Sequence, residues 1–189
     1  MKILKKGWML LLATIVSLGM QAQKASVETA SISMRSYNKT TEKKEVRIHN
    51  LKEAKKHVDM AYKNSTTSND PKMWLMRART YLAIHTDKLG EEGTSCIQDN
   101  DAIATAAEAI INCHKSDPKQ KYSRSRDAYE AFVGIAVSAQ NVAIYAYNDK
   151  EYDRAIQYYQ IPRDMIPFDD QSLIKRQNIT SDGLLNSIA

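Results

Sequence analysis

The sequence predicts an all-α fold, a short stack of antiparallel helix pairs, and a repeated spacing is the first observation behind this prediction. Small, bulky and small side chains recur at steps of four and three, which places them on one face of a helix. A lone helix cannot bury such a stripe, whereas stacked helices can. No alternation of polar and apolar residues typical of a strand occurs. The three sets are Ala54, Val58 and Ala61, then Ala106, Ile110 and Cys113, then Ala155, Tyr159 and Pro162.

Residues 1–22 have the pattern of a secretory signal peptide. Three lysines precede an apolar run from Gly7 to Met20, and Ala22 offers a small residue before a cleavage point. An apolar run of about 14 residues is too short to span a bilayer, which takes roughly 20. We therefore expect an exported chain, periplasmic or associated with the cell envelope, with no stable membrane span after cleavage. An uncleaved N-terminal anchor is the alternative.

The charge of the chain argues against a nucleic-acid partner. The full sequence has a net charge of +5, from 27 Lys and Arg against 22 Asp and Glu. Three of the lysines lie in the predicted signal peptide, which has no acidic residue, so the remainder is close to neutral at +2. No Lys- and Arg-rich face with interleaved aromatic residues is present.

The first elements after residue 22 are predicted to be a leader and two helices. Residues 23–45 are rich in Lys, Ser, Thr and Glu and are expected to form a polar, flexible leader. An apolar stripe among charged residues predicts a helix near 46–64. Asp70 and Pro71 then predict the start of a helix over 71–86, because Asp caps free N–H groups and Pro suits the first helical position.

Three further helices are expected after a glycine-containing loop at 88–94. Their apolar periodicity places them at 100–114, 123–148 and 151–161. Pro162 is expected to break or kink the last helix, because it lacks an N–H and its ring clashes with the preceding turn. The helical domain is thus predicted to span 46–167.

These helices resemble the tetratricopeptide repeat, a helix pair with small and aromatic residues at fixed steps. The segment NDKEYDRAIQYY at 148–159 is similar to the family's turn between its two helices, and 25 residues separate Tyr81 from Ala106 where the family has nine. The resemblance, to exported repeat proteins of Bacteroidetes-type bacteria, implies a short solenoid of such pairs. A half copy at Ala54, Val58 and Ala61 precedes one copy at Trp74, Arg77, Ala78, Tyr81, Ala106, Ile110, Cys113 and Pro118, and a second at Ala139, Val142, Ala143, Ala146, Ala155, Tyr159 and Pro167.

Residues 168–189 are predicted to be a linker and the start of an incomplete further repeat. Thr180, Ser181 and Asp182 favour a helix start, and Leu185 and Ile188 match the opening of another first helix. The second helix that would cover this face is not in the sequence. Either a partner or self-association covers it, or the chain is a truncated relative.

The resemblance also implies a groove for a partner, because the first helices of each pair line the concave face in that family. A protein or peptide is the expected partner, bound by a non-enzymatic interaction module. The groove positions carried over from the family are Lys72, Leu75, Arg79, Leu82, Gln140, Ile144, Tyr147 and Asn148.

Tyrosine content leaves a second function open. The chain has ten tyrosines against two phenylalanines, and five of the tyrosines lie within residues 145–159. Ordinary helix packing accounts for such rings, but tyrosine also forms recognition surfaces. The alternative function is an envelope-associated accessory protein that binds carbohydrate or peptidoglycan.

No catalytic, metal-binding or cofactor-binding residues are predicted. The four histidines are scattered, and no H-E-x-x-H, G-x-S-x-G, P-loop or G-x-G-x-x-G motif occurs. Two arrangements of the cysteines remain open. Cys96 and Cys113 form a disulfide in an oxidising compartment, or Cys113 is simply a packed thiol.

Overall fold

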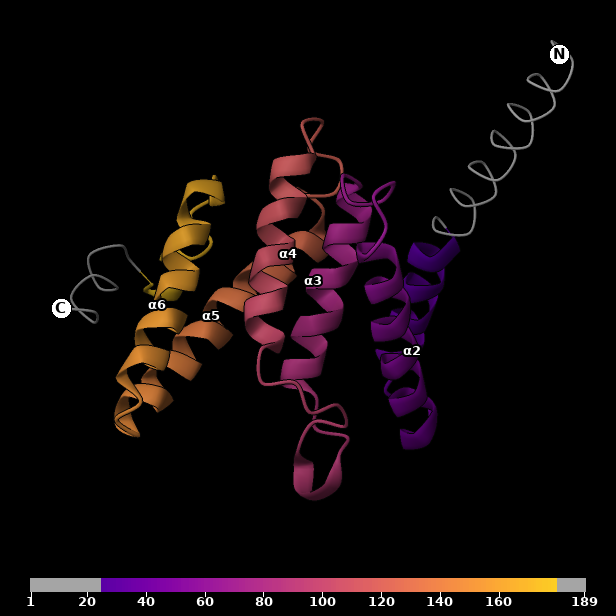
Figure 1. Ribbon diagram of the computed structural model, residues 1–189, viewed down its shortest axis with the longest axis horizontal. Helices are drawn as coiled ribbons and strands as arrows, with labels where there is room; N and C mark the ends of the chain where they lie inside the picture. The colour runs from indigo at the N-terminus through magenta and orange to yellow at the C-terminus, as the bar shows by residue number, and fades with distance from the viewer. Residues whose placement is uncertain (1–24, 180–189) are drawn as a thin grey trace, which may run out of the picture.

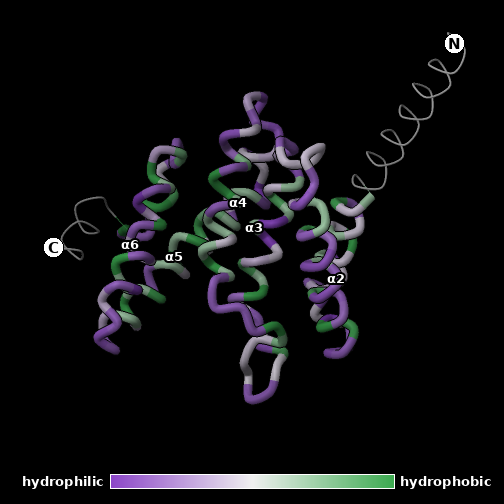
Figure 2. The backbone as a smooth tube through the Cα atoms, viewed as in Figure 1, coloured by the Kyte–Doolittle hydropathy of each residue, from purple (hydrophilic) through white to green (hydrophobic). Residues whose placement is uncertain are grey.

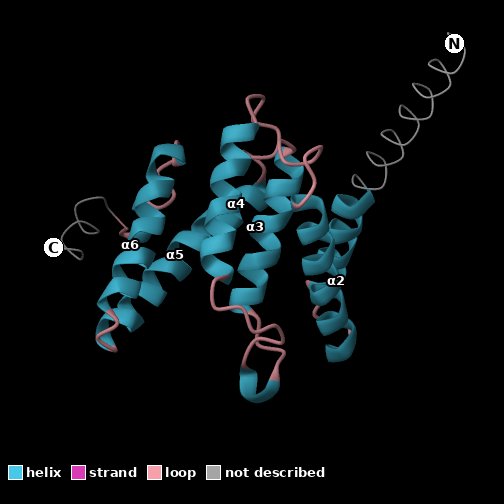
Figure 3. Cartoon of the chain, viewed as in Figure 1, coloured by secondary structure: helices cyan, strands magenta, loops and turns pink. Residues whose placement is uncertain are grey.

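The computed structural model describes residues 25–179, which form six α-helices and, within that range, no strand (Figure 1, Figure 3). The predicted all-α fold is confirmed. The predicted signal peptide at 1–22 and the predicted repeat start after residue 179 lie outside the described residues. A helix at residues 25–37 is followed by α2 (Lys44–Tyr62), α3 (Pro71–Thr86), α4 (Ala102–Ser116), α5 (Arg126–Asn148) and α6 (Tyr152–Met165), with short 3-10 turns η1 (Glu91–Gly93), η2 (Ile166–Phe168) and η3 (Lys175–Gln177).

The helices pack as pairs, α3 on α4 and α5 on α6. All nine residues of the repeated small, bulky, small pattern are buried, which confirms that the pattern marks the helix interfaces. Hydrophobic and hydrophilic residues are interspersed along the helices (Figure 2), and the buried core lies between the helices. None of the described helices is both long and apolar enough to cross a membrane.

The prediction of a flexible leader is wrong for residues 25–37, which form a helix packed on the stack. Val27, Ala30, Met34 and Tyr37 are buried, at steps of three and four that define one helical face. Arg47 of α2 donates a hydrogen bond from Nε to the carbonyl of Tyr37 at 2.8 Å. This helix therefore completes the pair of which the sequence shows only the second half, α2.

The predicted start of α3 is confirmed, whereas Pro162, expected to break or kink the last helix, does not break it. Asp70 accepts a hydrogen bond from the backbone nitrogen of Lys72 at 2.9 Å, and Pro71 opens α3. Pro162 lies inside α6, which continues to Met165. Its missing N–H removes one hydrogen bond within the helix, and its ring is buried in the core.

The long connection between α3 and α4 is fixed by the buried carboxylate of Asp87. This carboxylate accepts hydrogen bonds from the backbone nitrogens of Leu89 (3.3 Å) and Cys96 (2.7 Å) and from the hydroxyl of Tyr37 (3.0 Å). Burial raises the pKa of Asp87, but these donors lower it more, so the pKa lies below its ordinary value. Cys96 and Cys113 are free thiols, so the disulfide left open above is absent from this structure.

Residues 168–179 pack back on the core and do not extend from it as a linker. Ile174 and Ile179 are buried. The carboxylate of Asp169 accepts hydrogen bonds from the backbone nitrogens of Leu173 (2.6 Å) and Ile174 (2.8 Å), which closes a turn. Asp170 pairs with Arg124, just before α5. This segment therefore covers part of the last helix pair.

Candidate binding groove

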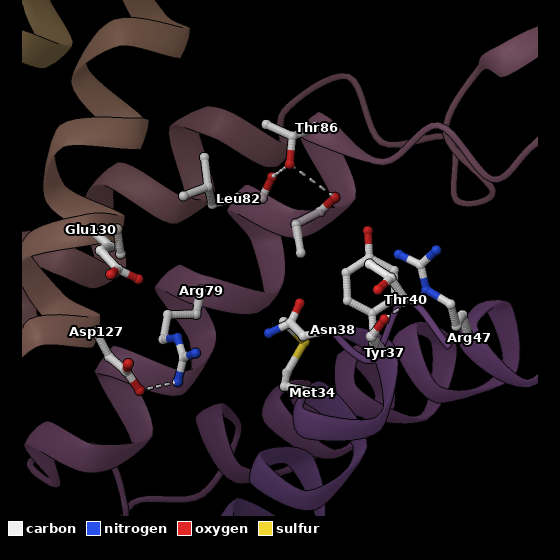
Figure 4. A pocket seen from close by; sticks show the side chains of 12 residues that line it. Met34, Tyr37, Asn38, Thr40, Arg47, Arg79, Leu82, Thr86, Asp127 and Glu130 are labelled. Carbon is white, nitrogen blue, oxygen red and sulfur yellow. Dashed lines mark hydrogen bonds and ion pairs between the residues drawn. The ribbon is translucent and has the colours of Figure 1, made fainter. Parts of the chain in front are cut away.

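A groove with a volume of about 410 Å³ lies between the helix at 25–37, α3 and α5 (Figure 4). The helix at 25–37 and α3 run parallel. Glu28, near the start of the former, pairs with Lys72 at the start of α3, and Tyr37, at the end of the former, donates a hydrogen bond to Asp87 at the end of α3. Stacked antiparallel pairs place their first helices parallel in this way. The groove is lined by Met34, Tyr37, Asn38, Thr40, Arg47, Arg79, Leu82, Ala83, Thr86, Asp127, Glu130 and Ala131.

Helix α3 supplies the floor of the groove. Arg79, Leu82, Ala83 and Thr86 are spaced i, i+3, i+4 and i+7, which is one face of a helix. Leu82 packs against α5 at Gly134, where a Cβ atom would lie 2.9 Å from Leu82 Cδ2. Glycine at this position therefore allows α3 and α5 to approach closely, and the centre of the floor is apolar.

The wall formed by α5 is acidic. Arg79 donates from Nη1 to Oδ2 of Asp127 at 2.5 Å, an ion pair that joins the floor to this wall. Glu130 lies about one turn further along and accepts a hydrogen bond from Nε of Arg126 at 2.7 Å. Both carboxylates lie on the same side of the groove in Figure 4. Each retains contact with solvent, so both are accessible to a partner.

The opposite wall comes from the helix at 25–37 and the start of α2, and Arg47 is its one charged lining residue. Burial and the neighbouring Asp87 carboxylate raise the pKa of Tyr37 well above its ordinary value, so its hydroxyl stays protonated and acts as a donor. The guanidinium carbon of Arg47 lies 5.3 Å from the centroid of the Tyr37 ring. Arg47 thus reaches the groove supported by an aromatic ring and a backbone carbonyl.

A polar network between α2 and α3 holds the floor helix in place. The carboxylate of Asp59 accepts hydrogen bonds from Arg77, from the Tyr81 hydroxyl (2.7 Å) and from Lys55 Nζ (2.8 Å). Burial raises the pKa of Asp59, but these donors outweigh it and hold the pKa below its usual range. The guanidinium of Arg77 also stacks 4.1 Å from the centroid of the Tyr62 ring.

Of the eight residues predicted to line a groove, Arg79 and Leu82 do so. Leu75 is only 5 % exposed and belongs to the core, so the prediction that it faces the groove is wrong. Lys72 also lies outside the groove, because it pairs with Glu28 of the helix at 25–37. The remaining four residues lie outside the groove, towards the C-terminal end of α5: Gln140, Ile144, Tyr147 and Asn148.

Sequence reasoning missed both walls of the groove. The sequence does not reveal Tyr37 and its neighbours because a segment rich in Ser and Thr is typical of a polar leader, although the buried residues of 25–37 follow helical spacing. Asp127 and Glu130 lie in the N-terminal half of α5, ahead of the segment that matches the repeat pattern. The helical spacing of Val27, Ala30, Met34 and Tyr37 is the signal that identifies the wall formed by residues 25–37, provided that small residues such as alanine count as apolar.

A second surface feature is an exposed aromatic patch where α5 turns into α6. Tyr147 and Tyr152 are 55 and 53 % exposed, and Ile144 and Tyr145 of α5 are exposed as well. The rings of Tyr147 and Tyr152 contact edge to face, with centroids 5.6 Å apart. Tyr158 and Tyr159 of the same hairpin are buried. The tyrosine-rich hairpin is therefore divided between core packing and an aromatic surface.

The chain matches no protein-family model, curated protein or solved structure. Within residues 25–179, no group of three or more His, Cys, Asp or Glu side chains is arranged to hold a metal ion. The geometry of the groove and of the aromatic patch is therefore what indicates a function.

Proposed function

We propose that this chain is a non-enzymatic interaction module of the tetratricopeptide type, which binds an extended segment of a protein or peptide in the groove. The position of the groove supports this most directly, because the first helices of three successive pairs line it. Stacked helical repeats form extended concave binding surfaces of this kind.

The chemistry of the groove suits a peptide of mixed charge. The apolar centre at Leu82 and Ala83 accommodates an apolar side chain, and Arg47 faces the acidic wall of Asp127 and Glu130. Opposite charges on the two walls orient a bound segment and contribute more to specificity and association rate than to affinity. Both carboxylates of the groove are paired with arginines.

Peptides selected from a random display library on the purified chain test this proposal. The affinity of the selected peptides is measured for the original chain and for three variants. Thr86→Arg and Glu130→Arg change exposed groove residues, and Met60→Arg changes a residue of α2 that is 52 % exposed and outside the groove. We expect the groove variants to weaken binding about tenfold or more, as a loss of 1.4 kcal/mol does. Equal affinity for all the variants and the original chain would refute the proposal.

A second candidate function is carbohydrate binding at the aromatic patch, favoured by the exposure of Tyr145, Tyr147 and Tyr152. Exposed rings stack on the apolar faces of sugars and lose little conformational entropy. Binding of the chain to peptidoglycan fragments and to a glycan array is compared with that of Tyr147→Ala and Tyr152→Ala. Retention that disappears in both variants supports this function, and retention that survives both excludes the patch.

We also propose that the chain is exported to the periplasm or cell envelope, because residues 1–22 have the pattern of a signal peptide. N-terminal sequencing of the protein recovered from its cells is expected to begin at Gln23 in the periplasmic or envelope fraction. A cytosolic chain that retains Met1 would contradict this expectation.

A further inference from the structure

A second cavity, with a volume of about 220 Å³, lies on a different part of the stack from the groove and shares no lining residue with it. Its walls come from the end of α3, the connection at residues 95–100, the start of α4, and the α5–α6 hairpin. The connection at 95–100 is the segment by which this chain departs from a regular helix pair. This cavity is therefore a product of the inserted residues.

Two opposite charges line this cavity without pairing with each other. Arg154 of α6 lines the cavity and donates from Nη1 to Glu151 at 3.0 Å. Asp99 accepts a hydrogen bond from the backbone nitrogen of Asp101 at 3.2 Å and lies 4.0 Å from Lys55 Nζ. Among the described residues no ion pair joins Arg154 to Asp99, although both face the same small space.

Tyr158 lines the same cavity and joins α6 to the connection at residues 95–100. Its hydroxyl donates to the carbonyl of Asn100 at 3.0 Å, and the guanidinium carbon of Arg154 lies 5.9 Å from its ring centroid. Burial raises the pKa of Tyr158, Arg154 opposes this rise, and Asp101 and Asp99 add to it. The hydroxyl therefore remains a neutral group that holds the connection against α6.

Half of the eight other lining residues are aliphatic, and the polar half is His85, Ser95, Gln98 and Asn100. Ile84 and Ile103 are buried in the core, while Ile97 and Val142 are half-buried and accessible from the cavity. Burial and the nearby Lys88 lower the pKa of His85, so this imidazole is neutral near pH 7 and adds no third charge. The cavity is therefore lined by a cation, Arg154, an anion, Asp99, and accessible aliphatic side chains.

We propose that this cavity binds a small zwitterion with an aliphatic side chain, a free amino acid such as leucine. Its carboxylate pairs with Arg154, its ammonium group pairs with Asp99, and its side chain packs against Ile97 and Val142. The cavity is smaller than the roughly 300–1,000 Å³ typical of sites for drug-sized ligands, which limits the ligand to this size class. The site is independent of the peptide groove.

Calorimetry and amide NMR titration of the purified chain test this with three probes, each at millimolar concentration. L-Leucine carries both charges, 4-methylpentanoate lacks the ammonium group, and 3-methylbutylamine lacks the carboxylate. We expect leucine to bind, with shifts in the amides of residues 95–103 and of Tyr158, and each single-charge analogue to bind about tenfold more weakly or worse. Absence of leucine binding, or equal binding of one analogue, would overturn the proposal.

Two variants and a matched control locate the site. Arg154→Gln is expected to weaken leucine binding about tenfold or more, and Val142→Trp to abolish it by filling the cavity. Arg163→Gln removes a charge from the same helix outside the cavity and is expected to leave binding unchanged. Unchanged leucine binding by both Arg154→Gln and Val142→Trp, with folding confirmed by circular dichroism, would also overturn the assignment.

Discussion

Replacing Tyr37 by phenylalanine removes one oxygen atom and, with it, the hydrogen bond that joins the helix at 25–37 to the end of α3. The hydroxyl donates to Oδ1 of Asp87 at 3.0 Å, and both residues are buried. The substitution leaves the ring, and therefore the packing, in place. The loss in stability consequently measures whether this helix is docked on the stack.

The expected magnitude follows from the charge of the acceptor. A hydrogen bond to a charged group contributes about 1.5–3 kcal/mol. Asp87 keeps its bonds from Leu89 and Cys96, so no bare buried carboxylate is created. For a chain of this size, 1 kcal/mol corresponds to about 2–4 °C in melting temperature, so Tyr37→Phe is expected to lower the melting temperature by about 3–12 °C.

The assay is urea and thermal unfolding followed by circular dichroism, with Tyr147→Phe as the matched control. Tyr147 is exposed, so this second substitution is expected to change the free energy of unfolding by less than about 0.5 kcal/mol. A double-mutant cycle with Asp87→Asn isolates the coupling between the two side chains. If Tyr37→Phe unfolds like Tyr147→Phe, the docked helix is refuted and a flexible leader is supported.

The same bond predicts a dependence on pH. The pKa of Asp87 is lower in the folded chain than its ordinary value, so the folded state binds fewer protons at this site than the unfolded state. Its contribution is fully present above the unfolded pKa of about 3.9 and is lost as the pH falls through the folded pKa. The stability difference between the original chain and Asp87→Asn should therefore shrink in acid.

Three further predictions concern the interior. The His114 ring contacts the rings of Phe132 and Phe168, and burial lowers the pKa of His114. The free energy of unfolding should therefore fall as the pH drops below the unfolded pKa of about 6.5. In urea titrations between about pH 7 and 5, His114→Phe should make this dependence weaker. Asp117→Asn weakens bonds from the backbone nitrogens of residues 122 and 123 and should cost about 1.5–3 kcal/mol in chemical unfolding; no loss would contradict the role of this carboxylate. Arg77→Met should cost less than the roughly 3–5 kcal/mol of a broken buried pair, because Asp59 keeps Lys55 and Tyr81; a loss above that range would refute this reasoning.

The sequence predicted those elements that carry their own local signals. Asp70 and Pro71 mark the start of α3, and the small, bulky, small spacing marks the buried faces of α2, α4 and α6. The helix at 25–37 carries a weaker signal, because its stripe of Val27, Ala30, Met34 and Tyr37 lies among serines and threonines. This helix is buried by contacts with α2 and α3. These contacts join residues far apart in the sequence, so the pattern within residues 25–37 does not reveal them.

The groove was predictable in part. The family resemblance placed Arg79 and Leu82 of α3 in a groove, and both line it. Which of those positions stay open depends on neighbouring helices. Leu75 shares the general face but is covered, and the α5 positions near Tyr147 lie beyond the groove. How neighbouring helices are aligned depends on tertiary packing, so the walls of the groove could be identified only from the structure.

Site-specific photo-crosslinking in the cells that produce the chain tests most directly whether the groove is the surface that meets a partner. A benzophenone amino acid is placed at Thr86 in the groove or at Met60 on α2, both exposed. We predict a discrete protein or peptide adduct from Thr86 that is lost when Glu130→Arg is added, and none from Met60. Adducts that form equally at both positions, or at Met60 alone, would contradict a partner-binding groove on the first helices.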